Sequence, residues 1–279
     1  MSLEIKHITT AIGSEVSGLD LNRKGVISDH AEQLQALLDE RQVIFFRDQH
    51  IDIDRHVELA SVFGDPVGSS EFPHVPESEY VRIITGNGKK IGTDIWHTDQ
   101  SWKKVPPAGA CLCAIDVPET GGDTMWASMT AAYDALDPDF QAYLRTLTVI
   151  HHWENAELVE TLMDRDPSGK IYRELRESRS PMEHPLVMQH PRTGKPTIFA
   201  NSLYTTAIQG VPPERSWDLL NMLFRLPHTP EIQVRFAWRP GSIAIWDNMA
   251  TQHYAVNDYY GYPRRMHRVG IHQRTNGTA

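Results

Sequence analysis

The chain has 279 residues, a formal net charge of −9, and 40% hydrophobic and 23% charged residues, which is ordinary for a soluble globular protein. Nucleic-acid binding requires clustered Lys and Arg, and the sequence has no such stripe, so we expect no nucleic-acid partner. No run of about 18 apolar residues exists to span a membrane, and residues 1–6 contain no apolar signal-peptide core. We therefore expect no membrane partner and a cytoplasmic location.

Short apolar segments separated by turn signals predict strands and helices in the first part of the chain. In order, these are a strand and turn over 5–21, a helix from a Ser28 N-cap to Gln42, a strand over 43–46, and a helix over 54–62 that Gly64 ends. Residues 65–78 are rich in Pro, Gly and Ser and have no clear period, which predicts a loop. We expect a loop or lid over about 65–93 that could fold over a site.

The rest of the chain alternates between strand-like and helical segments. The predicted elements are strands starting within 106–114 and 123–126, helices over 130–136 and 138–144, strands at 184–187 and 198–200, a helix over 213–225, and strands from 243 onward. Residues 154–183 are charged and weakly periodic, which indicates a mobile insertion or lid. Many short strands favour a mostly β fold with flanking helices, a jelly-roll-like barrel, over a doubly wound sheet. We expect one domain over 1–279.

The two cysteines, Cys111 and Cys113, lie two residues apart on a predicted strand. Two cysteines are too few for a disulfide framework, and this spacing is not that of a zinc ribbon. We predict that both are reduced thiols in the core.

The segment Trp96-His97-Thr98-Asp99 is the first candidate for chemistry. It precedes a predicted buried strand, so we expect it to be extended, which would place His97 and Asp99 on one face. An imidazole and a carboxylate side by side are two metal ligands, and a second His would complete a facial triad of the kind that holds iron(II). A His-x-Asp pair alone is a weak signal in a chain with 14 His and 36 acidic residues.

The partners of this pair are predicted near the end of the chain. A strand over 243–246 leads through an Asp247-Asn248 turn into a second strand that carries His253, the expected third ligand. Farther on, period-2 counting places Arg264 and Arg268 on one face of a strand, where both can point into one cavity. Two buried guanidiniums need anionic partners, which a dicarboxylate co-substrate and an acidic substrate would supply.

Several motifs, in the same order and at similar intervals, resemble the taurine dioxygenase family of iron(II)- and 2-oxoglutarate-dependent oxygenases. They are Trp96-His97-Thr98-Asp99, Pro106-Pro107-Ala108-Gly109, Gly121-Gly122-Asp123-Thr124, His190-Pro191-Arg192-Thr193-Gly194-Lys195, Ile245-Trp246-Asp247-Asn248, Thr251-Gln252-His253-Tyr254-Ala255 and the Arg-rich stretch 264–268. The resemblance runs from about Ile12 to Arg268 and implies a double-stranded β-helix.

The resemblance also implies cofactors and roles. Fe(II) would be held by His97, Asp99 and His253, and 2-oxoglutarate and O2 would be the co-substrates, with succinate and carbon dioxide released. The distal carboxylate of 2-oxoglutarate would be bound by Arg264 with help from the Thr124 hydroxyl, and Arg268 would lie beside it. Halogenating relatives carry a small residue at the position of Asp99, so its presence here favours hydroxylation.

Substrate contacts are predicted from the same resemblance. The positions that carry a His, a Tyr and an Asn in the taurine enzymes are here Ser69, Phe72 and Thr93, and Arg268 is kept. This change removes polar partners of a small zwitterion, so taurine is the less favoured substrate. We expect a larger acid such as an alkyl sulfate, an alkyl or aryl sulfonate or an aryloxy carboxylate. Gln100 and Tyr204 complete the predicted substrate set.

An alternative is a non-catalytic β-barrel with a structural or sensory zinc site, since zinc accepts two His, an Asp and water. Such a site would not need Arg264, Arg268 and Thr124, which distinguishes the two hypotheses. His74, His151 and His152 are not expected to bind metal, because none has an acidic partner at ligand spacing. We also expect a homo-oligomer, either a dimer or a tetramer.

Overall fold

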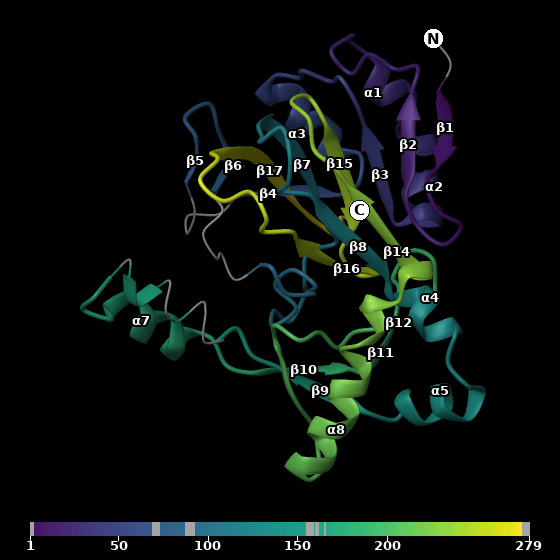
Figure 1. Ribbon diagram of the computed structural model, residues 1–279, viewed down its shortest axis with the longest axis vertical. Coiled ribbons are helices and arrows are strands. Elements are labelled where there is room, and N and C mark those ends of the chain that lie inside the picture. Colours follow the sequence, from purple (N-terminus) through teal and green to yellow (C-terminus); the bar gives the residue numbers. More distant parts are fainter. Residues whose placement is uncertain are drawn as a thin grey trace, which may run out of the picture.

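The computed structural model describes residues 3–68, 73–86, 93–154, 159, 162–164 and 166–274, and the structural statements below concern these residues. It confirms a mostly β fold with flanking helices (Figure 1). Among the helices of the described ranges, none has the length and apolar character needed to cross a membrane. One domain over 1–279 stays a prediction.

Two sheets form the body of the molecule. The strands of the large sheet are β1 (Glu4–His7), β2 (Ser14–Ser17), β3 (Val43–Phe46), β4 (Asp65–Val67), β5 (His74–Val75), β6 (Ser78–Gly86), β7 (Gly109–Asp116), β15 (Ile243–Asp247) and β17 (Arg264–His272). Their order is β1-β2-β3-β15-β7-β17-β6-β5, with β4 paired to β17. The small sheet has the order β14 (Gln233–Phe236), β8 (Thr124–Ser128), β16 (Thr251–Ala255). Only β2 and β3 pair in parallel in the described ladders.

The two sheets face each other across an aromatic core. Phe45 of β3 stacks on Phe236 of β14 with ring centroids 4.2 Å apart, and Trp126 of β8 lies 5.8 Å from Trp246 of β15. All four side chains are buried. Contacts of this kind between the inner faces of two sheets are what a jelly roll requires, and they confirm the predicted double-stranded β-helix.

Helices cover the outer face of the large sheet (Figure 1). They are α1 (Val26–Asp29), α2 (Ala31–Arg41) and α3 (Ile53–Ser61). The predicted helix from Ser28 to Gln42 is wrong at its start, because the helix is interrupted at His30 and the Ser28 hydroxyl donates to the Gly25 carbonyl instead of capping. The end is right, since Gln42 adopts a left-handed conformation with φ of 64°.

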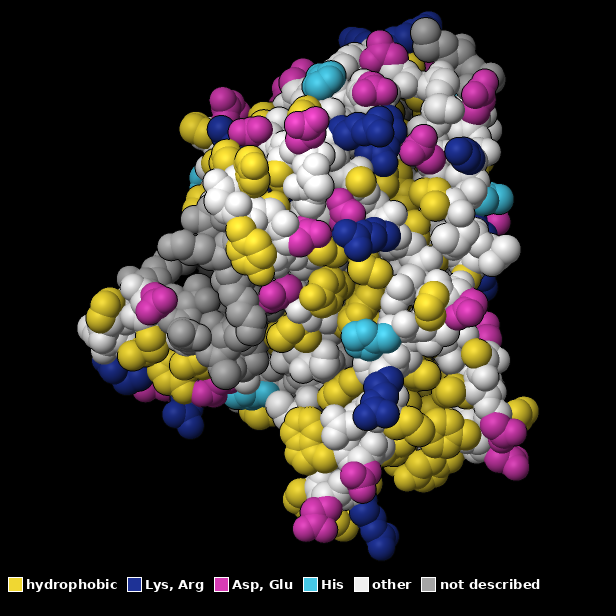
Figure 2. Space-filling view, in the orientation of Figure 1, with side chains coloured by type: hydrophobic (Ala, Val, Ile, Leu, Met, Phe, Trp, Pro, Cys, Tyr) yellow, Lys and Arg dark blue, Asp and Glu magenta, His cyan; other side chains and the backbone are white. Residues whose placement is uncertain are grey.

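The remaining elements lie outside the two sheets, and all but α7 gather at one end of them. These are α4 (Met129–Asp134), α5 (Pro138–Leu144), β9 (Thr148–His151), α7 (Lys170–Ser178), β10 (Met182–Pro185), β11 (Val187–Gln189), β12 (Pro196–Ile198), β13 (Thr205–Ile208), α8 (Pro213–Leu223), η1 (Leu226–His228) and η2 (Pro230–Ile232). Asp137 caps α5 as predicted. Hydrophobic side chains gather at the lower end of Figure 2. On α5 and α8 the exposed large hydrophobic residues are Tyr143, Trp217 and Met222.

Several predicted boundaries are wrong. The strand expected from Pro106 begins at Gly109, because Pro106 and Pro107 have no N–H to donate to a ladder. The strand expected at 198–200 is instead β12, which ends at Ile198. The predicted loop over 65–78 contains β4 and β5, which sequence periodicity could not reveal because they are short and pair with distant strands.

The two predicted lid segments fall partly outside the described residues. Within about 154–183 the structure describes α7, which has no buried side chain and projects from the body (Figure 1), and the start of β10. Within about 65–93, residues 69–72 and 87–92 lie outside the described part. Movement of either segment stays a prediction.

Candidate metal centre

His97, Asp99 and His253 come together between the two sheets, as predicted. Their ligand atoms all lie within 4.8 Å of one another. His97 Nε2 is 3.9 Å from Asp99 Oδ1, and His253 Nε2 is 3.7 Å from Asp99 Oδ2. The two histidines face each other across an isolated antiparallel bridge, in which each backbone N–H donates to the carbonyl of the other at 3.0 and 2.8 Å.

The predicted extended backbone through Trp96–Asp99 is only partly right. His97 forms the bridge to β16, but Asp99 and Gln100 lie in a turn, and Gln100 has a φ of 48°. The i, i+2 spacing therefore brings His97 and Asp99 together without a strand between them. A side chain on a turn needs other contacts to fix its position, and those contacts come from β15 and the turn that follows it.

Asn248 supplies these contacts through its side-chain amide. Its Oδ1 accepts from the Asp99 backbone N–H at 2.8 Å, and its Nδ2 donates to the Asp99 carbonyl at 3.0 Å and to the Pro107 carbonyl at 2.9 Å. Asn248 is 1% exposed, so water does not compete for these bonds. The local sequence predicts only a turn at Asn248, because its partner Asp99 is 149 positions away.

The turn that contains Asn248 is itself held by a buried hydrogen bond. His190 Nε2 donates to Asp247 Oδ2 at 2.7 Å, while Asp247 Oδ1 accepts from the backbone N–H groups of Met249 and Ala250 at 2.8 and 3.0 Å. The motif that begins at His190 thus supports the turn between β15 and β16. This turn carries the chain from the large sheet to the small one, which delivers His253 opposite His97.

The ring of His97 is oriented by a backbone carbonyl. Its Nδ1 lies 2.7 Å from the Ile95 carbonyl oxygen, and because a carbonyl only accepts, Nδ1 must carry the proton. Nε2 is then left with a free lone pair directed at the centre of the cluster, as in metal-binding histidines generally. His253 Nδ1 is buried and has no hydrogen-bond partner in the described part of the chain.

The electrostatics hold each group in its metal-binding form. Burial alone would raise the pKa of Asp99, but the charge of Arg268, followed by His253 and His97, lowers that pKa well below its usual range. Burial lowers the pKa of His97, and it lowers the pKa of His253 to about 3. At neutral pH the cluster therefore has one carboxylate and two neutral imidazoles, which is the donor set of an iron(II) facial triad.

Arg268 and Arg264 share the inner face of β17, as predicted, with Met266 between them in the aromatic core. Arg268 Nη2 donates to Asp99 Oδ2 at 2.5 Å, and its guanidinium carbon lies 5.4 Å from the centre of the Trp246 ring. Arg264 is 8% exposed, and its Nε has no partner among the described residues. A buried guanidinium with an unused donor is a site that favours an anion.

Two aromatic rings flank the guanidinium of Arg264. Its guanidinium carbon lies 6.0 Å from the ring centres of both Trp238 and Tyr259. The Trp238 Nε1–H donates to Thr124 Oγ1 at 3.0 Å, so the Thr124 hydroxyl keeps its own hydrogen for another acceptor. Gly122 has a φ of 71°, and a Cβ there would lie 3.2 Å from Tyr259, so glycine leaves room for the ring. Trp238, Tyr259 and Gly122 were not predicted.

The structure describes only some of the residues that were predicted to contact the substrate. Ser69 and Phe72 lie outside the described residues. The Thr93 carbonyl accepts from the Ala255 N–H at 3.1 Å, which ties it to the end of β16, and Gln100 lies in the turn after Asp99. The pKa of the Tyr204 phenol is raised by burial and then by the charge of Asp99.

The family model described as taurine catabolism dioxygenase TauD, TfdA family matches residues 4–269. The chain belongs to this family. An alkylsulfatase of Acinetobacter baylyi is 30% identical over 271 residues, covering 96% of this chain and 84% of the relative. An alpha-ketoglutarate-dependent sulfate ester dioxygenase of Pseudomonas putida is 32% identical over 276 residues, covering 97% of this chain and 90% of the relative.

A solved structure leads to the same family. A taurine dioxygenase from Burkholderia xenovorans superposes with a TM-score of 0.82 at 31% identity, covering 97% of this chain and 89% of that chain. TauD/TfdA proteins of this kind are dioxygenases that use Fe(II), 2-oxoglutarate and O2. The protein is therefore an oxidoreductase that acts on a small molecule, and the comparisons favour this hypothesis over a non-catalytic zinc barrel.

Proposed function

We propose that this TauD/TfdA enzyme hydroxylates a small acidic organic substrate at an iron(II) centre held by His97, Asp99 and His253. The convergence of these three ligand atoms within 4.8 Å carries the proposal. The orphaned Nδ1 of His253 is compatible with a ring whose other nitrogen binds metal, and the free lone pair on His97 Nε2 fits the same role. The donor set of two imidazoles and one carboxylate leaves positions for other ligands.

Arg264 and Thr124 are the proposed binding groups for the distal carboxylate of 2-oxoglutarate. Arg264 has an unpartnered buried Nε, and the Thr124 hydroxyl is oriented by Trp238 with its hydrogen available. A carboxylate in this pocket would satisfy both donors through charge-assisted hydrogen bonds. Trp238 and Tyr259 exclude water from the pair, which strengthens it.

Iron, 2-oxoglutarate and O2, when bound, would supply the oxidation, in which one oxygen atom of O2 enters succinate as carbon dioxide is released and the other hydroxylates a substrate carbon. The residues of the chain position the reactants. Asn248 fixes the backbone of Asp99, the Ile95 carbonyl sets the orientation of His97, and Arg268 presents a positive charge next to the cluster. We propose that Arg268 binds the acidic head of the substrate and turns from Asp99 to it when the centre is loaded.

Among acidic substrates, we propose a sulfate ester with an apolar body ahead of taurine. The alkylsulfatase and the sulfate ester dioxygenase named above support this choice, and so does the composition of the substrate set. Ser69, Phe72 and Thr93 offer fewer polar partners than a small zwitterion needs. Alkyl or aryl sulfonates and aryloxy carboxylates remain within the proposed class.

Succinate formation over a panel of acids tests this proposal. The purified protein would receive Fe(II), 2-oxoglutarate and, in turn, a medium-chain alkyl sulfate, an alkylsulfonate, an aryloxy carboxylate and taurine. Hydroxylation at the carbon that bears the ester oxygen leaves a product that collapses to an aldehyde and free sulfate, so the alkyl sulfate should also yield one sulfate per succinate. Taurine as the fastest substrate, or an unchanged substrate KM in Arg268→Ala, would overturn the pocket assignment.

The remaining expectations stay predictions. Tyr143, Trp217 and Met222 are 47%, 48% and 44% exposed on α5 and α8, which supports a homo-oligomer, either a dimer or a tetramer. Light scattering of the purified protein would measure its mass in solution. A cytoplasmic location and the absence of nucleic-acid and membrane partners are likewise proposed.

A further inference from the structure

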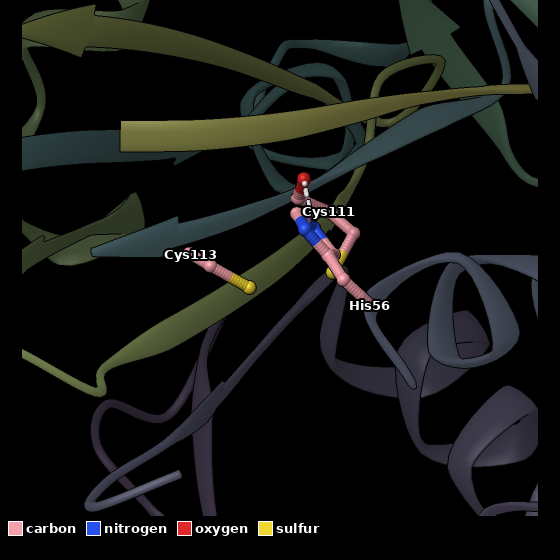
Figure 3. Close-up of side chains that lie close together, drawn as sticks. All are labelled: His56, Cys111 and Cys113. Atoms are coloured by element: carbon pink, nitrogen blue, oxygen red, sulfur yellow. Dashed lines mark hydrogen bonds between the residues drawn. The ribbon is translucent and has the colours of Figure 1, made fainter. Parts of the chain in front are cut away.

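A second group of metal-ligand side chains lies on the outer face of the large sheet, away from the iron centre. It consists of His56 from α3 and Cys111 and Cys113 from β7 (Figure 3), which we call the thiol cluster. The three residues are 2%, 0% and 5% exposed. Because side chains alternate along β7, these two cysteines face the helices, whereas Leu112 between them faces the aromatic core.

The spacing of the thiol cluster is close to that of a bound ion. One ligand atom from each residue lies within 4.8 Å of the other two. A nitrogen and a sulfur, or two sulfurs, bound tetrahedrally to zinc are about 3.5–3.8 Å apart, so binding needs a contraction of at most about 1.3 Å. Rotation about the Cα–Cβ bonds of the cysteines can supply a change of that size without moving the backbone.

The ring of His56 is oriented as metal-binding histidines are. Its Nε2 lies 3.1 Å from the Cys111 carbonyl oxygen, which accepts only, so Nε2 carries the proton. Nδ1 therefore keeps its lone pair. A ligand imidazole that donates its other N–H to a backbone carbonyl is the usual arrangement around structural and catalytic metals.

A fourth donor lies on the neighbouring strand. His267 of β17 pairs directly with Cys113 of β7 and shares its face, since Val269 and Cys111 both belong to the outer core. His267 is 8% exposed, and its Nε2 is buried with no hydrogen-bond partner among the residues that the structure describes. His267 does not belong to the group whose ligand atoms lie within 4.8 Å of one another, so its ring must turn toward the thiols before its Nε2 can serve as a fourth ligand.

Both cysteines are free and buried, which confirms the expectation of reduced core thiols. That expectation did not include a ligand role, because the two histidines approach from elements distant in the sequence.

We propose that His56, Cys111, Cys113 and His267 form a second metal site that binds Zn²⁺ and joins α3 to β7 and β17. Two thiolates and two imidazoles make up a set that selects zinc over iron(II), whereas the catalytic triad has no sulfur ligand. The site would be structural, because four protein ligands leave no open position. It is independent of the proposed catalytic function.

Cobalt substitution tests the site, because thiolate ligation gives Co²⁺ an intense near-ultraviolet charge-transfer band that nitrogen and oxygen ligands do not. The full chain would be produced in cobalt-supplemented minimal medium, since the buried cluster must fill as the protein folds. We expect the band in the wild type and in Asp99→Ala, which removes a ligand of the other centre. We expect its loss in Cys111→Ser and in Cys113→Ser.

X-ray absorption of the wild-type cobalt or zinc protein provides a second measurement that needs no variant. The proposal requires sulfur scatterers at about 2.3 Å from the metal. A bound metal with only nitrogen and oxygen neighbours would overturn it. So would a wild-type protein that contains no zinc after growth in zinc-rich medium and releases two reactive thiols on unfolding.

Discussion

Asp99 owes its position to Asn248 rather than to regular secondary structure. The Asn248 amide bonds to both backbone groups of Asp99 and to the carbonyl of Pro107, at 2.8 to 3.0 Å. Because Asp99 lies in a turn, its backbone depends on these bonds, while Arg268 Nη2 holds its carboxylate. Asn248 is therefore a positioning residue for the metal centre, although it does not touch the metal itself.

Replacing Asn248 with Ala should weaken iron binding while the protein stays folded. Loss of a residue that orients a metal ligand typically costs about 10–100-fold in metal affinity. Anaerobic titration with Fe(II) would measure the Kd, and circular dichroism would confirm the fold. Asn22→Ala is the matched control, because Asn22 is an exposed Asn that bonds only to residues far from the centre. A wild-type Kd for Fe(II) in Asn248→Ala would show that Asn248 does not position the metal ligand Asp99.

At the residue scale, the sequence predicted which candidate ligands come together, but it did not predict their backbone conformation. The spacing of His97 and Asp99 suggested a strand, but the turn at Gln100 brings the pair together instead. Contacts such as Asn248 with Asp99 or His190 with Asp247 span 149 and 57 positions, and no local pattern encodes them. Motif intervals pointed to the candidate ligand residues, while the contacts that support them are visible only in the structure.

The strand β17 combines two roles on its two faces. Arg264 and Arg268 point into the barrel with Met266, whereas Val269 and Ile271 pack against the helices. Period-2 counting predicted which side chains lie on each face of β17. Both faces of the large sheet are covered, so a register shift of one residue would turn the arginines toward the helices and the apolar residues into the barrel. The bulge between Arg265 and Met266 on the β7 side was not predicted.

Arg264→Ala should raise the concentration of 2-oxoglutarate needed for half-maximal rate. Losing one partner of a desolvated charge pair typically costs about 2–5 kcal/mol, which corresponds to about 30-fold or more. Arg265→Ala is the matched control, since Arg265 is the next residue on β17 and is exposed. Succinate formation at varied 2-oxoglutarate would give both values. Equal half-saturation in Arg264→Ala and Arg265→Ala would refute the assignment.

The packing of β3 on β14 should dominate the stability of the barrel. Phe45 is fully buried, stacks on Phe236 at 4.2 Å and meets Trp126 edge-on at 5.4 Å. Phe45→Ala should lower the free energy of unfolding by about 3–5 kcal/mol in a denaturant titration, through lost burial and the cavity left behind. Tyr260→Ala, at a side chain that is 74% exposed, should change it by less than about 0.5 kcal/mol. Similar values for the two variants would contradict this packing account.

Across the whole molecule, buried neutral histidines make stability depend on pH. Burial lowers the pKa of His151 and of His253 from the ordinary 6.5 to about 3. Their folded pKa is below the unfolded one, so their contribution is intact above pH 6.5 and is lost as pH falls toward 3. At pH about 5, which is about 1.5 units below the unfolded pKa, each histidine should lower the free energy of unfolding by up to about 2 kcal/mol, since one pKa unit corresponds to about 1.36 kcal/mol.

Denaturant titrations of the iron-free protein at pH about 7.5 and about 5 would measure this loss. His151 contacts Ser101 and Thr205 and is not a predicted metal ligand, so His151→Gln separates its share. The variant should have a lower free energy of unfolding than the wild type at pH about 7.5, but this free energy should fall less between pH about 7.5 and about 5. Identical pH dependence in wild type and variant would show that His151 is not the titrating group.

The architecture as a whole was accessible from the sequence because many short strands and ordered motifs favour only one fold class. What the sequence could not give were pairings that depend on distant partners, such as β4 with β17, and the interruption of the first helix at His30. The thiol cluster also belongs here, because Cys111 and Cys113 gain His56 and His267 only when α3 and β17 pack beside β7.

The central claim is that His97, Asp99 and His253 bind iron together with 2-oxoglutarate, and the visible charge-transfer absorption of the anaerobic mixture tests it most directly. The wild type should show a weak visible band when Fe(II) and 2-oxoglutarate are both present and none with either alone. Asp99→Ala should fold normally and lack the band. A band of wild-type intensity in Asp99→Ala would contradict the account.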